Sequence, residues 1–283
     1  MRVTFDTNVL DLACRPERFP KDPRQAELAK VHSALKGGAI EGFYSVTMLT
    51  VEGIMKKDRA AVFAGTTVTS TAHPTEMTKR SDLPKELADM LGDGDFDVIT
   101  TGVTLQAGQP QRPPLHPEVV ARIQAAKALG VRVLHDVPRI GAFGLTDPTG
   151  EYYLDRGEGA ALSAWIDSAF AVSREIEARG LGFSQLCTLG VSLASGPDAT
   201  WFAALDKAAD VHQRRQVERA FAEWADGDSL AAHIAYGIDV FCSADVGRSN
   251  ATNSVLDPAN RAWLSNSYGV RFMTFEDLAA TLP

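Results

Sequence analysis

The strongest constraint on this fold is an alternation of short apolar runs and helix-like segments at both ends of the chain. Residues 3–5 predict a strand that ends at Asp6, where residue types that cap helices follow. Near the other end, the apolar run 240–243 predicts a buried strand, and Asp245 lies just past it. Apolar strands joined by helices are typical of parallel sheets. The sequence therefore predicts an α/β fold with a central, mostly parallel sheet between layers of helices.

The same alternation continues through both terminal parts of the chain. Further strands are predicted at 42–45 and 270–273, and further helices at 23–35, 45–63, 200–224 and 276–282. The string Asp226-Gly227-Asp228 is interpreted as a break, after which Asp228 begins a new helix that ends at Gly237. Glu52 falls near the second turn of the helix 45–63.

The middle of the chain has no such simple pattern. Strands are predicted at 66–71, 98–105 and 131–135, and helices at 117–129 and 158–179. We therefore predict one elaborated domain over residues 1–283, with a core of 1–60 and 205–283 and an insertion of about 61–204.

Composition limits the classes of function. The 45% hydrophobic and 23% charged residues are ordinary for a globular protein, and no apolar run approaches the roughly 20 residues of a membrane span. We expect a cytoplasmic protein without membrane contact. The three cysteines are widely spaced and form no disulfide or zinc pattern. A net charge of −8 argues against a general polyanion-binding surface, so any nucleic-acid contact should be local.

Four acidic residues are predicted to meet at one edge of the sheet. Asp6 and Asp245 each follow a strand, Asp228 begins a helix, and Glu52 lies early in the helix after the second strand. Ligands of parallel sheets bind at the carboxyl ends of the strands. Grouped carboxylates repel one another unless cations compensate, and oxygen ligands favour Mg²⁺ or Mn²⁺. The series predicts a metal site suited to two-metal hydrolysis of a phosphodiester.

Three strings in the sequence resemble those of PIN domains. Val-Thr-Phe-Asp-Thr-Asn-Val-Leu at 3–10 is similar to the opening of that family, and 45–54 resembles its second acidic segment. The segments 228–237 and 240–245 resemble its closing acidic pattern. The resemblance covers roughly residues 1–60 and 205–283. It implies a metal-dependent endoribonuclease with a nucleic-acid partner, RNA before DNA, and with the metal-binding and catalytic acids Asp6, Glu52, Asp228 and Asp245.

The same resemblance gives supporting roles to two further residues, and position in the chain suggests roles for others. Asn8 and Ser243 match the polar helpers near the metals. Lys56 and Arg248 are candidates for binding phosphate, because they follow Glu52 and Asp245 closely. His233 is expected to be a packing residue rather than a general base, since it lies about 140° around the helix from Asp228.

Other interpretations stay open. Taken singly, each acid could be a helix cap or a turn residue. The long insertion and the acidic charge favour a non-catalytic PIN-like binding or scaffold module as the main alternative. A phosphatase with Asp6 as nucleophile ranks last, because residue 8 is Asn rather than a second Asp. A protein partner or a homo-oligomer is compatible with the sequence.

Overall fold

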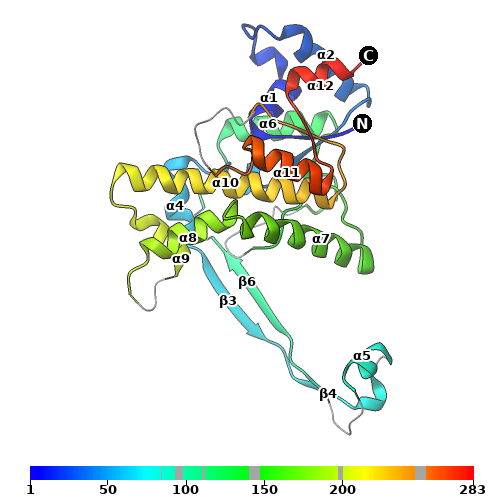
Figure 1. Cartoon of the computed structure of the whole chain (residues 1–283), viewed down its shortest axis with the longest axis vertical. Helices are drawn as coiled ribbons and strands as arrows, with labels where there is room; N and C mark the ends of the chain where they lie inside the picture. Colours follow the sequence, from blue (N-terminus) through cyan, green and yellow to red (C-terminus); the bar gives the residue numbers. More distant parts are fainter. Residues whose placement is uncertain (84, 93–97, 110–111, 140–146, 197–199, 246–252) are drawn as a thin grey trace.

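A five-stranded parallel sheet forms the centre of the protein. The computed structural model describes residues 1–83, 85–92, 98–109, 112–139, 147–196, 200–245 and 253–283 (Figure 1). In order across the sheet, its strands are β7 (Arg132–Leu134), β2 (Glu41–Ser45), β1 (Arg2–Phe5), β8 (Val240–Cys242) and β9 (Arg271–Met273). Every neighbouring pair in this sheet is parallel. The expected α/β class with a parallel central sheet is confirmed.

Helices cover both faces of the sheet, because its side chains alternate between two apolar surroundings. Val3 and Phe5 of β1 pack with one group of helices, namely α1 (Thr7–Cys14), α2 (Gln25–Lys36), α6 (Pro117–Ala128) and α12 (Phe275–Thr281). Phe241 of β8 packs on the opposite face, against α7 (Gly159–Ala178), α10 (Val211–Ala235) and α11 (Pro258–Tyr268). Burial on both faces explains why these strands are continuous apolar runs.

The helix α10 is the longest of the described elements, and it contacts most of the elements on the second face of the sheet. It contacts α7 and α8 (Phe183–Leu193), and it also touches β2, β7, α3 (Thr47–Thr50) and α4 (Lys56–Ala64). Near its middle, Phe221 and Trp224 pack against Phe63 with ring centroids 4.9 and 5.1 Å apart. The short α9 (Trp201–Ala204) and the 3₁₀ turn η3 (Leu205–Lys207) close this cluster.

Most predicted elements are confirmed within one or two residues. The expected helix 200–224 is instead α9, η3 and the first part of α10, and the expected strand 98–105 is divided into β5 (Val98–Thr100) and β6 (Val103–Gly108). Two other differences affect the acidic residues. The expected helix 45–63 is divided into α3 and α4 by a turn that contains Glu52. The expected break at Asp226–Asp228 does not occur, since α10 continues through both residues. In addition, the expected insertion supplies β7, an edge strand of the central sheet.

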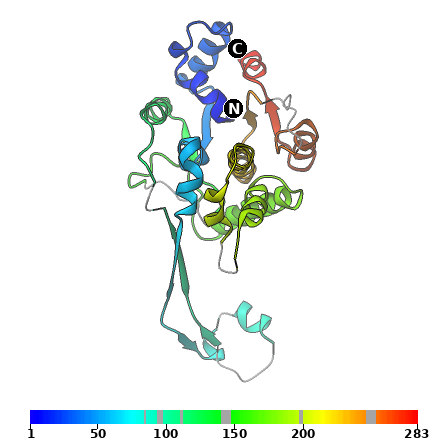
Figure 2. The same ribbon diagram turned by 90° about the vertical axis from the view of Figure 1, so that its left-hand side faces the viewer.

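Part of the insertion forms a long arm. After α4, the strand β3 (Thr67–Ala72) pairs antiparallel with β6 (Val103–Gly108), and this ribbon projects away from the helical body (Figures 1 and 2). Its far end contains the strands β4 (Glu76–Thr78) and β5 (Val98–Thr100), the 3₁₀ turn η2 (Arg80–Asp82) and the helix α5 (Lys85–Met90). Every residue of β3 is exposed.

Among the described residues, no helix is both long enough and apolar enough to cross a membrane.

The aromatic cluster around α10 leads to a prediction about stability. Phe221→Ala should lower the free energy of unfolding by roughly 3–5 kcal/mol, because Phe221 is fully buried and a cavity would remain. Val211→Ala removes a side chain that is 62% exposed on the same helix, and should change stability by less than about 0.5 kcal/mol. Urea unfolding followed by circular dichroism measures both values. Equal losses for the two variants would contradict the packing described for Phe221.

Candidate functional site

The carboxyl ends of β1 and β8 hold a connected group of polar side chains. Asp6 caps α1, where its Oδ1 accepts a hydrogen bond of 2.7 Å from the backbone N–H of Thr7. Its Oδ2 accepts one of 2.6 Å from the Ser243 hydroxyl, whose oxygen in turn accepts from the backbone N–H of Asp245 at 3.0 Å. Asn8 joins the two strand ends, since its Oδ1 accepts from the backbone of Ala244 at 3.0 Å. The predicted Asp6, Asn8, Ser243 and Asp245 therefore do lie together.

Glu52 reaches the same place from the other side of β1. The turn between α3 and α4 holds it so that its Oε2 accepts a short hydrogen bond from the Thr7 hydroxyl. A small cavity of about 10 Å³ lies here, and its lining includes Asp6, Glu52 and Asp226 together with the hydroxyl-bearing residues Thr7, Ser45, Thr47 and Ser229. A space of this size matches one water-sized sphere. Three carboxyl-bearing residues from separate elements thus line one polar cavity.

The third acid at this cavity is Asp226, which was not among the predicted site residues. Asp226 lies in α10, and repulsion from Asp6 and Glu52 contributes to raising its pKa. Residues two apart in an α-helix differ by about 200° in direction. In one continuous helix, Asp226 and Asp228 therefore cannot both face the same cavity.

Asp228 forms a buried ion pair away from the acidic group. Its carboxylate is held by the Arg139 guanidinium, with Nη2 at 2.7 Å from Oδ1 and Nε at 2.8 Å from Oδ2, and by the indole N–H of Trp224 at 2.7 Å. Arg139 also contacts Glu177 at 2.7 Å and lies over the ring of Phe183. The structure thus corrects the predicted placement of Asp228 at the shared edge. The physical reason is the continuity of α10.

Gly227 explains why an unbroken helix contains a glycine at this position. A side-chain carbon at Gly227 would lie 3.1 Å from the Cα of Gly182, at the start of α8. The glycine therefore permits close contact between α10 and α8, rather than a chain break. A sequence signal for this alternative exists, since the seven-residue spacing of Trp224 with Ala231 and of Ala225 with Ala232 keeps apolar residues on one helix face across Gly227.

The carboxyl groups at the cavity resist ionisation. Burial, followed by repulsion from Glu52, raises the pKa of Asp6 from 3.8 to about 6, although the Ser243 hydrogen bond opposes the change. Burial and then repulsion from Asp6 hold the pKa of Asp226 well above its usual range. Burial also raises the pKa of Glu52. These directions indicate a site with more negative charge than its own protein groups compensate.

The donor chemistry of this group fits a hard divalent cation. Asp6, Glu52 and Asp226 offer only oxygen atoms, the ligands that Mg²⁺ and Mn²⁺ prefer. As the described side chains are placed, no three Asp, Glu, His or Cys groups are close enough together to hold one ion. The acids would need to approach one another to share a cation, and a cation would remove the repulsion that now opposes their approach.

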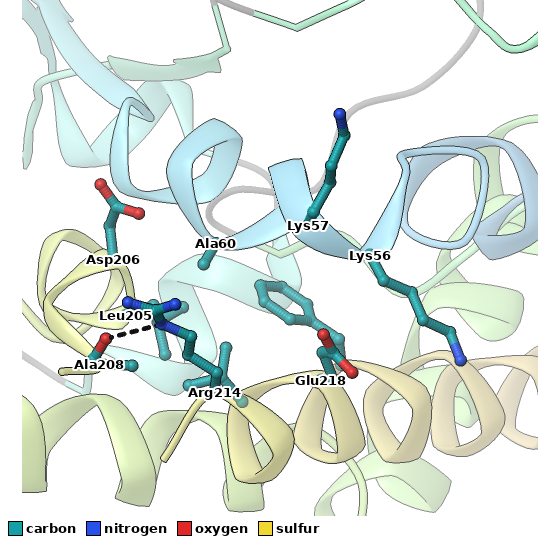
Figure 3. A pocket seen from close by; sticks show the side chains of 10 residues that line it. Lys56, Lys57, Ala60, Leu205, Asp206, Ala208, Arg214 and Glu218 are labelled. Carbon is teal, nitrogen blue, oxygen red and sulfur yellow. Dashed lines mark hydrogen bonds between the residues drawn. The ribbon is translucent and has the colours of Figure 1, made fainter. Parts of the chain in front are cut away.

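The two predicted phosphate-binding residues have different outcomes. Lys56 begins α4 and is exposed. It is close enough to Glu52 for its positive charge to oppose the rise in the pKa of that carboxyl. It lines a hollow of about 310 Å³ between α4 and the first turns of α10, with Lys57, Arg214, Asp206 and Glu218 around it (Figure 3). Arg248 lies outside the described residues. Its proposed contact with phosphate stays a prediction.

Asp136, also absent from the predicted site, lies behind the cavity. The hydroxyl of Ser45, which lines the cavity, donates to Asp136 Oδ1 at 3.0 Å. Burial and then repulsion from Asp228 raise the pKa of Asp136 well above its usual range. His233 is buried as expected and shares a 2.9 Å hydrogen bond with the Thr4 hydroxyl, so its predicted packing role is confirmed.

Comparisons of this chain with protein-family profiles, with curated proteins and with solved structures found no match.

The opposite surroundings of two neighbouring aspartates give a paired prediction. Asp228→Asn should lower the free energy of unfolding by roughly 2–4 kcal/mol, because it leaves part of the buried Arg139 charge uncompensated. Asp226→Asn should leave stability unchanged or raise it in metal-free buffer, because it relieves repulsion among Asp6, Glu52 and Asp226. Chemical denaturation at pH 8 with a chelator present measures both. Destabilisation by Asp226→Asn as large as that by Asp228→Asn would contradict these assignments.

The raised pKa of Asp6 predicts a pH-dependent contribution to stability. The unfolded chain releases this proton near pH 4 and the folded chain near pH 6, so the folded state binds more protons between these values. The Asp6 contribution is therefore fully present below pH 4 and is lost as pH rises through 6. A shift of this size corresponds to about 2–3 kcal/mol.

Comparison with a variant isolates this contribution. Buried His233, whose pKa is lowered to about 3, makes the protein lose stability as pH falls below the usual histidine range, which is the opposite trend. The difference in unfolding free energy between the original protein and Asp6→Asn removes that common effect. This difference should change between pH 4 and 7 in metal-free buffer. A flat difference for Asp6→Asn would rule out the raised pKa.

Proposed function

We propose that this chain is a metal-dependent nuclease of the PIN type, with an acidic site formed by Asp6, Glu52, Asp226 and Asp245. The observation that carries the proposal is the meeting of Asp6, Glu52 and Asp226 at one polar cavity. Asp245 is linked to it through Ser243. The parallel sheet and the resemblance of segments 3–10, 45–54, 228–237 and 240–245 support the PIN-like form of the fold. In this proposal Asp226 replaces Asp228 as the third acid.

Two of the acids, Asp6 and Glu52, have polar neighbours that would fix the direction of their lone pairs. The Ser243 hydroxyl donates to one oxygen of Asp6, and the backbone N–H of Thr7 donates to the other. The Thr7 hydroxyl donates to one oxygen of Glu52. These bonds hold the carboxylates in place without neutralising them, so their charge remains available to a cation.

Mg²⁺ or Mn²⁺ would be held by Asp6, Glu52, Asp226 and Asp245. When bound, such ions lower the pKa of an attacking water and stabilise the negative charge that develops on a phosphodiester. The protein residues hold and orient the ions and exclude bulk water from one side of the cavity, because Phe5, Met48 and Ala225 line it.

The surroundings of the site support a local contact with a nucleic-acid strand. Lys56 lies beside Glu52, and the hollow that it lines with Lys57 and Arg214 contains cationic groups able to contact phosphates. Asp206 and Glu218 line the same hollow. The mixture of charges is consistent with a short contact rather than a long electrostatic track. RNA is the proposed substrate because the family resemblance implies it.

The proposal predicts cleavage of RNA that requires both metal and the acidic site. The original protein should cleave a labelled RNA in Mn²⁺ and lose this activity in chelator. Asp6→Asn and Asp226→Asn should each lower the rate at least about 100-fold, because each removes a charged ligand. Asp167→Asn changes an exposed aspartate of α7 that lines neither the cavity nor the hollow, so it is the matched control and should retain the rate. Gel analysis of the products at fixed times measures the effect.

The same variants separate a nuclease from a non-catalytic module. Isothermal calorimetry should detect Mn²⁺ binding that Asp6→Asn and Asp226→Asn abolish. Metal binding without cleavage of RNA or DNA would favour the binding or scaffold alternative. Equal cleavage by the original protein and both site variants would refute the proposed acidic site, since a contaminating nuclease would then explain the activity.

A further inference from the structure

The projecting ribbon of β3 and β6 has two chemically different faces. In its antiparallel register, Val68 is opposite Ala107, Ser70 is opposite Leu105, and Ala72 is opposite Val103. Residues directly opposite each other share a face of the ribbon. One face is therefore apolar apart from Ser70. The alternate positions place threonines, Gln106 and a glycine on the other face.

The apolar face is exposed to solvent. The exposed fractions are 64% for Leu105, 56% for Val103 and 42% for Val68. Both views show the ribbon leading away from the helical body rather than folding back onto it (Figures 1 and 2). An isolated two-stranded ribbon is only marginally stable in water, and amphipathic strands normally pack their apolar face against another surface. This face therefore has the character of an interface.

The far end of the arm extends the exposed apolar surface. Met77 of β4 is directly opposite Ile99 of β5, and both are largely exposed. Three further apolar side chains are exposed in or next to α5, namely Leu87, Met90 and Leu91. Removing the apolar surface of this arm from water would therefore release more free energy than burying a polar loop of the same length.

The absence of charge on the ribbon strands limits the kind of molecule that can cover them. The strands β3 and β6 contain no Lys, Arg, Asp or Glu residue. A nucleic-acid strand would require cationic groups there. Two copies of the chain, by contrast, can bring these strands together without like-charge repulsion, although each copy carries −8 overall. A two-fold axis sets the same patch against itself, and interfaces of this kind are more apolar than those between unlike chains.

We propose that the apolar face of the β3–β6 ribbon, formed by Val68, Ser70, Ala72, Val103, Leu105 and Ala107, packs against the same face of a second copy of this chain. The contact joins two arms and leaves the threonine-bearing faces in solvent. This inference does not depend on the proposed nuclease activity. Because each partner contributes few residues, the dimer should dissociate reversibly on dilution.

Sedimentation velocity on the full chain tests the proposal. From about 1 µM to about 500 µM, the original protein should change from monomer to dimer. Leu105→Glu places a charge on the apolar face and should raise the dissociation constant at least about tenfold. Gln106→Glu adds the same charge at the next residue, on the opposite face, and should leave the constant within about twofold. A monomer throughout the range, or equal effects of the two variants, would overturn the proposal.

A crosslinking experiment gives an independent readout. Ser70→Cys lies in the middle of the apolar face and should form a disulfide-linked dimer under mild oxidation, whereas Thr69→Cys on the opposite face should not. The unsubstituted chain is the control for its own cysteines, of which Cys14 and Cys242 are buried. Circular dichroism verifies that both variants fold. Crosslinking of Thr69→Cys as fast as that of Ser70→Cys would overturn the face assignment and the proposal with it.

Discussion

The parallel pairing of β1 between β2 and β8 is the constraint on which the rest of the structure depends. It sets Val3 opposite both Gly42 and Val240, so the carboxyl ends of all three strands meet at one edge. The first residue past β1 then donates its backbone N–H to the last carbonyl of β8, at 2.9 Å between Asp6 and Cys242. This bond fixes the spacing between Asp6 and the polar segment that contains Ser243. The candidate site is therefore built on the most buried part of the sheet.

The helix α10 carries two aspartates with opposite electrostatic surroundings near that edge. One of its two central aspartates, Asp226, adds to the repulsion at the cavity. The other, Asp228, is neutralised by a two-point contact with Arg139 and by the Trp224 indole. Because α10 is continuous, Asp228 meets Arg139 on one side of the helix while Asp226 lies at the cavity on the other. The same helix thus carries one aspartate under electrostatic repulsion and another that is neutralised by an ion pair.

The body and the arm obey different physical rules. Four clusters of buried apolar side chains stabilise the body, and the packing of its helices on both faces of the sheet leaves the strand ends as its polar edge. The described part of the arm contains no residue in these clusters, and its apolar side chains face solvent. Hydrogen bonds between β3 and β6 maintain its shape, but they do not cover its surface. The body can fold on its own contacts, whereas the arm is suited to contacts with another molecule.

The sequence by itself determined the strands of the central sheet, their parallel arrangement and the places of Asp6 and Asp245, because a buried strand followed by an acid leaves little choice of position. It also indicated Glu52 through its place in the series, although not the turn that presents it. The choice between Asp226 and Asp228 was decided only by tertiary structure. The string Asp-Gly-Asp is compatible both with a helix break and with a continuous helix. The structure shows that α10 is continuous, and the close contact of Gly227 with Gly182 explains the glycine at this position. In a continuous helix the two side chains point about 200° apart. The buried Arg139, distant in sequence, pairs with Asp228, and Asp226 is the one that lies at the cavity.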